Sequence, residues 1–144
     1  MVDAELVERR LGEIEEATKY VSLLLEEGEE KFASSFKSRL ALRHLILMIV
    51  ESAASIALHI LAEDFEERAE SYGEAFEKLA RRGVLKPETA LEMAAMARLR
   101  NLIVHRYWLV DDLRIYREAR GSGLEIVRRF VEEVRRYVRE NQVL

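Results

Sequence analysis

The sequence predicts an all-α fold, an antiparallel bundle of four to five helices that forms one domain over residues 1–144. One Pro and six Gly in 144 residues leave few positions for turns, whereas sandwiches and barrels need many. Apolar residues recur at steps of three and four, which is the spacing of one buried helical stripe. The hydrophobic share of 49% and the charged share of 35% are those of a folded domain, so disorder is excluded.

The first two predicted helices are long and are separated by a glycine. The first covers about Val2–Glu27, and Gly28 interrupts it. The second covers about Glu30–Ala62, and its centre, Leu40–Leu61, is nearly apolar all round. Such a surface is typical of the helix that its neighbours enclose most completely.

A few polar side chains break the apolar surface of this second helix: Arg43, His44, Glu51 and His59. We expect them to form buried or interfacial polar pairs, Arg43 with Glu51 among them. No metal is predicted, because a four-helix di-metal site needs Glu-x-x-His repeats on two helices, whereas Glu51 and His59 lie eight residues apart and unaccompanied. No cofactor is predicted either, since a Gly-rich phosphate loop is missing from the sequence.

Capping signals define the shorter helices that follow. Ser71-Tyr72-Gly73-Glu74 has the form of a capping box, so a third helix begins there and ends near Arg82, with Gly83 as its stop. Pro87 is placed as the first residue of a fourth helix that runs to about His105 or a little beyond.

The last part of the chain is predicted to contain two more helical segments. Asp111–Arg120 is helical by composition and is expected as a short separate piece. Gly121–Gly123 is the clearest predicted break, and a final helix covers about Leu124–Glu140.

Composition also bears on location and partners. Without cysteine, neither a disulfide framework nor a thiolate metal site can form. Charged residues stand where a signal peptide needs an apolar core, and the longest apolar run, about Leu45–Val50, is far short of the ~20 residues that span a bilayer. A cytoplasmic protein without a membrane association is therefore predicted. A net charge of −4 argues against a grip on long duplexes but permits a local basic cleft.

The segment Arg98–Trp108 carries the unusual chemistry of the chain. At ~100° per residue, Asn101, His105 and Trp108 fall on the side of the fourth helix opposite its core residues. Arg98 lies two turns before His105 and shares this outer face, and Arg100 pairs with Tyr107 on a neighbouring flank. Such a mixture is too apolar for free solvent and too polar for a core, so it indicates a subunit interface with a wet centre.

These side chains suit metal-free cleavage of RNA. Histidine titrates near neutrality, so His105 can take a proton from a ribose 2′-OH that attacks the adjacent phosphate. Arginine is a permanent planar cation that stabilises the charge growing on the phosphoryl oxygens. The reaction needs both a base and an acid, and a two-fold dimer along this face would bring a second His105 into the same cleft.

The motif resembles a known one. Arg100-Asn101-x-x-x-His105-x-Tyr107 is similar to the Arg-x4–6-His signature of HEPN-domain RNases and, in this form, to the HepT-type toxins of HepT/MNT toxin–antitoxin systems. The apolar second helix, the Tyr72 to Phe76 segment and the residues after the motif are also similar to that family, so the resemblance covers essentially the whole chain.

The resemblance implies a HEPN-like homodimer that has the motif in its dimer cleft and cleaves RNA, tRNA in some members. It implies His105 as general acid and base, Arg100 at the phosphate, and Asn101 and Arg98 in support. Both arginines satisfy the spacing to His105, so the key arginine stays open. It further implies a minimal nucleotidyltransferase antitoxin that transfers AMP to Tyr107, and it leaves assembly beyond a dimer open.

Other interpretations compete with this one. The chain can be a HEPN interaction module that binds a nucleotidyltransferase or a nucleotide without catalysis, or a plain helical dimerisation protein. His105 can be an ordinary interface histidine, and Trp108 a packing aromatic near a helix end.

Overall fold

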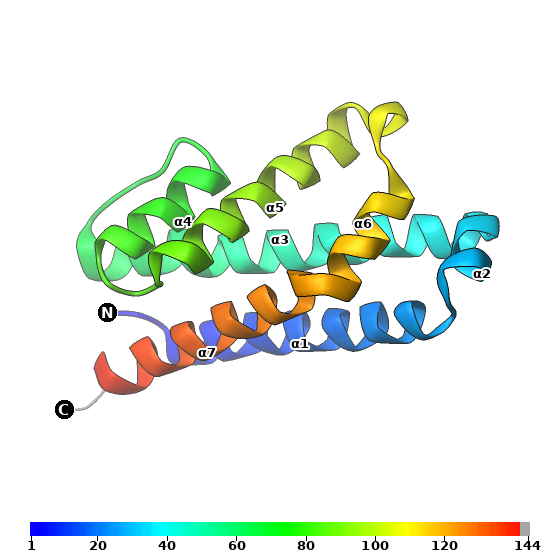
Figure 1. The fold of residues 1–144 in the computed structure, drawn as a ribbon. Helices are drawn as coiled ribbons and strands as arrows, with labels where there is room; N and C mark the ends of the chain where they lie inside the picture. Colours follow the sequence, from blue (N-terminus) through cyan, green and yellow to red (C-terminus); the bar gives the residue numbers. More distant parts are fainter. Residues whose placement is uncertain (142–144) are drawn as a thin grey trace.

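The computed structural model describes residues 1–141, and within that range the chain is helical almost from end to end and contains no β-strand. Long helices build the bundle (Figure 1): α1 (Ala4–Glu26), α3 (Phe36–Phe65), α5 (Pro87–His105) and α7 (Leu124–Asn141). Shorter ones connect or flank them: α2 (Glu29–Ser34), α4 (Tyr72–Arg81) and α6 (Asp112–Glu118). The predicted all-α bundle is confirmed.

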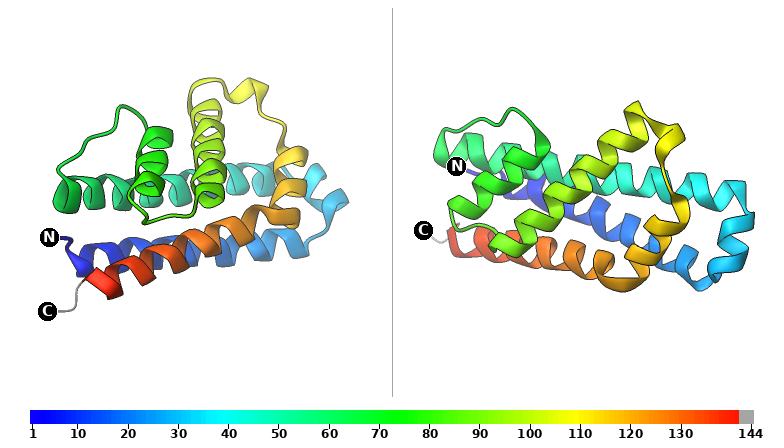
Figure 2. Two further views of the ribbon diagram at one scale, coloured as in Figure 1. Left: turned by 60° about the vertical axis from the view of Figure 1, so that its left-hand side comes forward. Right: turned by 45° about the horizontal axis from the view of Figure 1, so that its top comes forward.

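The helices form layers. α1 and α7 lie side by side in opposite directions, and α3 returns antiparallel to α1 (Figure 1). On the other side of α3, α4 and α5 rise as an antiparallel pair that crosses it at a steep angle (Figure 2). The Phe76 ring of α4 meets the Phe130 ring of α7 edge to face at 5.9 Å, so the two sides are joined through the core.

The expected second helix, Glu30–Ala62, is not continuous. Ser35 has extended backbone angles (φ −103°, ψ 108°) and divides it into α2 and α3. The Ser35 hydroxyl accepts a hydrogen bond from the Ser38 amide at 3.1 Å, which is the contact that defines an N-cap. A serine within an otherwise helical pattern therefore starts a new helix here.

The predicted break at Gly121–Gly123 is also wrong. Residues Ala119–Gly123 form a π-helical turn, η2, that joins α6 to α7 without leaving the helix. A Cβ added at Gly123 would lie 3.1 Å from the Glu118 carbonyl oxygen, so glycine is the residue that the wide turn accepts. The glycines widen the helix instead of ending it.

Helix α3 is the centre of the molecule. Its buried residues extend from Ser38 to Leu61 and contact α1, α4 and α5. Among the described residues it alone is long and apolar enough to cross a bilayer, but the core helix of a bundle meets the same test, and more than half of its most apolar stretch is buried.

The starts of α4 and α5 agree with the prediction. The Ser71 hydroxyl accepts from the Glu74 amide at 3.1 Å, and Pro87 is the first residue of α5. Gly83 adopts a positive φ of 77° directly after α4, a conformation that glycine reaches without steric cost. The connection between the two helices is therefore short, and their surfaces pack directly against each other.

Candidate functional site

Helix α5 ends at His105, which decides how the motif residues are arranged. Arg106 leaves the helical region (φ −140°, ψ 49°), and Tyr107–Leu109 form a separate 3₁₀ turn, η1. Asn101 and His105 lie exposed on α5 as predicted. Tyr107 and Trp108 do not continue that helical face, so the helical projection used for them is wrong beyond His105.

The Arg100 guanidinium is held on three sides. Its Nε and Nη2 lie 2.8 and 2.7 Å from Oε1 of Glu51 on α3, and its Nη1 donates to Oδ1 of Asn101 at 3.0 Å. Its central carbon lies 5.4 Å from the centre of the Tyr72 ring, within cation–π range. The cation is thus oriented before any ligand binds.

Glu51 links Arg100 to a third helix. Its Oε2 accepts a hydrogen bond from the Tyr72 hydroxyl at 2.8 Å. This hydrogen bond, together with partial burial and the carboxylate charge, raises the pKa of Tyr72, while the Arg100 charge opposes the shift. One carboxylate therefore fixes a cation from α5 and a phenol from α4.

Part of this cluster is predictable from the sequence. Glu51 interrupts an apolar helix and was expected to pair, but its partner is Arg100 and not Arg43. Arg43 and Glu51 are eight residues apart, about 12 Å along one helix, and cannot meet. Tyr72 was predicted only as part of a cap, and its role in the cluster was missed.

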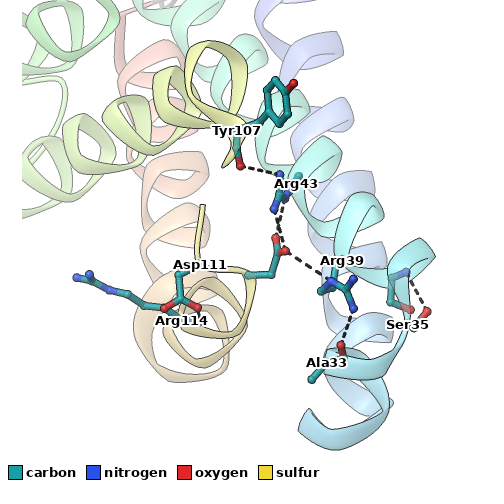
Figure 3. A network of polar contacts seen from close by, with 9 residues as sticks. Ala33, Ser35, Arg39, Arg43, Tyr107, Asp111 and Arg114 are labelled. Carbon is teal, nitrogen blue, oxygen red and sulfur yellow. Dashed lines mark hydrogen bonds and ion pairs between the residues drawn. The ribbon is translucent and has the colours of Figure 1, made fainter. Parts of the chain in front are cut away.

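The turn after α5 is fixed through its backbone. Arg43 donates from Nε and Nη2 to the two Asp112 carboxylate oxygens at 2.7 and 2.9 Å, and from Nη1 to the Tyr107 carbonyl at 3.2 Å (Figure 3). The hydrogen bonds to Asp112 raise the pKa of Arg43. Because the contact to η1 uses only its main chain, the side chains of the turn remain available.

Those side chains project outward. Tyr107 is 61% exposed and Trp108 is 66% exposed, and their rings meet edge to face at 5.3 Å. His105 is exposed, and its side chain forms no hydrogen bond or ion pair with residues 1–141. Arg98 is equally free within that range, and it faces the groove between α4 and α5 instead of joining Arg100.

The structure therefore brings Arg100 and Asn101 into contact, and it leaves Arg98, His105 and Tyr107 as separate exposed groups. Residues 1–141 contain no group of three or more His, Asp or Glu side chains arranged to hold a metal ion. The site offers one oriented cation, an unengaged imidazole five residues later on α5 and an exposed phenol on the turn that follows.

The family is identified by a profile described as "Ribonuclease HepT-like", which matches residues 9–134. The chain belongs to this HepT-like family of the HEPN class.

The individual relatives and solved structures share 27% identity or less with this chain. A tRNA nuclease HepT of Aphanizomenon flos-aquae (strain 2012/KM1/D3) is 27% identical over 115 residues, which are 80% of this chain and 78% of that protein. The tri-AMPylated HEPN toxin of Shewanella oneidensis, solved in complex with its MNT antitoxin, has a TM-score of 0.84 at 20% identity and covers 94% of this chain and 99% of its own. YutE of Bacillus subtilis has a TM-score of 0.80 at 19% identity, and the match covers 99% of this chain and 96% of YutE. The two structures show the shared fold.

Proposed function

We propose that the chain is the toxin of a HepT/MNT-type toxin–antitoxin pair and acts in the cytoplasm as a metal-independent endoribonuclease. The observation that carries the proposal is that α5 presents an oriented Arg100 and, five residues later at its C-terminal end, an unengaged His105, within a chain of the HepT-like family. The name of the Aphanizomenon relative supports tRNA as the first substrate to test.

Arg100 retains donors for a phosphate. A guanidinium has five N–H groups. Glu51 and Asn101 account for three of them, which leaves one N–H on each terminal nitrogen. Two donors at fixed positions match the two-pronged recognition of a phosphate, and they stabilise the negative charge that grows on its oxygens.

His105 supplies the proton transfers. As a base it removes the proton of a ribose 2′-OH, whose oxygen attacks the neighbouring phosphorus. The bond from phosphorus to the 5′-oxygen of the next nucleotide breaks, and that oxygen leaves with a proton from an acid. The products are a 2′,3′-cyclic phosphate and a free 5′-OH. In a two-fold homodimer a second His105 serves as the acid.

The partner is an MNT-type nucleotidyltransferase, as in the complex of the Shewanella toxin. We infer that it silences this chain by transferring AMP from ATP to Tyr107, with pyrophosphate as the leaving group; the Tyr107 phenol is exposed and lies two residues from His105. An added phosphate there is an anion that competes for Arg100 and blocks the cleft. Mass spectrometry after co-expression tests this: Tyr107 carries AMP, and Tyr107→Phe carries none.

Cleavage of total tRNA in EDTA tests the enzyme. Wild type is compared with His105→Ala and Arg100→Ala, and with His44→Ala and Arg128→Ala as matched exposed controls on other helices. We expect wild type and controls to cut and leave 2′,3′-cyclic phosphate ends, and both site variants to be inert while still dimeric. Equal inertness of all five, with unmodified Tyr107, would favour the interaction module without catalysis.

A further inference from the structure

A polar groove lies between α4 and α5, beside the candidate site. It has a volume of about 600 Å³. Small side chains form its floor, where a Cβ added at Gly73 would lie 3.6 Å from the Cβ of Ala94, so the two helices approach closely. Asn101 lines the groove and also accepts from Arg100, which makes the groove continuous with the site.

The groove carries uncommitted positive charge. Arg98 on α5 and Arg81 on α4 both line it and are exposed, and neither side chain forms a hydrogen bond or ion pair with residues 1–141. Its two acids differ. Glu74 is paired with Lys78 at 3.1 Å, and this hydrogen bond lowers the pKa of Glu74. The charge of Arg81 acts on Glu74 only at a distance, where it helps to lower the pKa of that carboxyl. Glu77 is the one acid of the lining without such a partner in the described chain.

Asn101 adds a neutral donor. An arginine offers only N–H groups, so the amide atom that faces Arg100 must be the oxygen. The Asn101 NH₂ group therefore points away from Arg100 and is available as a donor. The side of the groove formed by α5 thus presents one cation and one amide donor next to the cation of Arg100.

We propose that this groove is a subsite for an RNA backbone phosphate next to the scissile one, with Arg98 as its main contact and Arg81 opposite. The inference rests on the proposed ribonuclease function. Arg98 lies seven residues before His105, about 10 Å along the axis of α5, so a strand held at His105 passes the groove. Arg98 and Arg100 thus have different roles. Arg100, fixed by Glu51, acts at the reacting phosphate, whereas Arg98, which is free to adapt, binds the RNA backbone beside it.

Binding of fluorescently labelled tRNA tests the subsite in the His105→Ala protein, where the RNA stays intact. Removing Arg98 (Arg98→Gln) weakens binding about five-fold and reduces the slope of log affinity against log salt by ~0.7. Arg98→Gln with Arg81→Gln weakens it further. Arg128→Gln, an exposed arginine of α7 without an ion pair in residues 1–141, is the matched control and binds normally.

Glu77→Gln provides a variant that no loss of folding can imitate. It removes the unpaired acid of the groove, so we expect tighter tRNA binding. In the protein that retains His105, Arg98→Gln raises KM for tRNA and leaves kcat unchanged.

These experiments distinguish a failure of the subsite proposal from a failure of the ribonuclease proposal. If Arg98→Gln binds like Arg128→Gln and Glu77→Gln does not tighten binding, the subsite is overturned while cleavage by wild type keeps the enzyme. A fall in kcat at constant KM overturns it as well, because Arg98 then takes part in the chemistry. If wild type neither binds nor cuts tRNA, both proposals fall.

Discussion

At the N-terminal end of α5, the Glu133 carboxylate of α7 accepts from the Lys86 amide and the Thr89 hydroxyl, each at 2.7 Å. At the C-terminal end, His105 has no polar partner within residues 1–141, and the turn after it exposes Tyr107 and Trp108. At the N-terminal end of α5, the sealed end, even a buried carboxylate has its hydrogen-bond donors. At the C-terminal end, the open end, polar side chains have no partner within residues 1–141.

The difference separates stability from function. A buried carboxylate with two hydrogen bonds anchors α5 to α7, and its loss would strand buried donors. Unmatched polar groups at a fixed helix end contribute little to folding, and a second molecule can satisfy them. Variants at the two ends should therefore fail in different assays.

The largest expected effect is at the open end. His105→Ala should lower kcat for tRNA cleavage by about 100-fold or more, because the proton transfers lose their catalyst. The free energy of unfolding should change by less than about 0.5 kcal/mol, since the ring is exposed and unpaired in the described chain. Kinetics and urea unfolding check both statements. A large loss of stability would show that this end also holds the fold together.

The sealed end should give the opposite result. Glu133→Ala should lower the free energy of unfolding by about 3 kcal/mol, because the Thr89 hydroxyl and the Lys86 amide lose their shared acceptor. The kcat of the protein that remains folded should stay at the wild-type value. Glu132→Ala, an exposed neighbour, is the control and should have little effect on either quantity. A fall in kcat at full folding would contradict the separation of the two ends.

Glu51 contributes to both stability and catalysis, because it fixes Arg100. Glu51→Ala should reduce kcat about ten-fold with little change in KM. A guanidinium that is no longer held in place still attracts the substrate, but it aligns less well with the charge of the transition state. Glu51→Asp should recover part of the rate. Stability should fall by about 1–2 kcal/mol, because Glu51→Ala removes both the partly exposed ion pair with Arg100 and the hydrogen bond from Tyr72. Wild-type kinetics in Glu51→Ala would mean that Arg100 needs no positioning.

The sequence predicted much of the helical frame because periodicity and caps are local. The positions of Ser71, Gly83 and Pro87 located the boundaries of α4 and α5 correctly. The breaks at Ser35 and Gly121–Gly123 were misjudged, since a cap and a π-turn depend on backbone geometry that composition does not reveal.

The site was predictable only in part. The spacing made Arg98, Arg100 and His105 candidates, but it could not show what holds Arg100. Glu51 and Tyr72 lie 49 and 28 residues before it in the chain and meet it only because α3, α4 and α5 pack together. No local pattern contains that contact. The end of α5 near His105 agrees with the prediction, but the separate 3₁₀ turn after it was missed, since Tyr107 and Trp108 continue the helical spacing of the sequence.

The smallest expected effect concerns Tyr72 and pH. Its hydroxyl donates to Glu51, and the pKa of Tyr72 is raised above its ordinary value of about 10. A group whose folded pKa is raised contributes stability that is present below the unfolded pKa and is lost as pH rises through the folded pKa. Tyr72→Phe should therefore cost about 0.5–1 kcal/mol at pH 8, the contribution of one hydrogen bond.

Above pH 10 that difference from wild type should shrink. Tyr20→Phe, an exposed tyrosine without a hydrogen bond in the described chain, is the control and should leave stability unchanged at both pH values. Urea unfolding at pH 8 and pH 10.5 measures this, and absorbance titration near 295 nm follows the phenols. If Tyr72→Phe costs the same at both pH values, the hydroxyl does not contribute through Glu51, and the anchor of Arg100 reduces to the carboxylate alone.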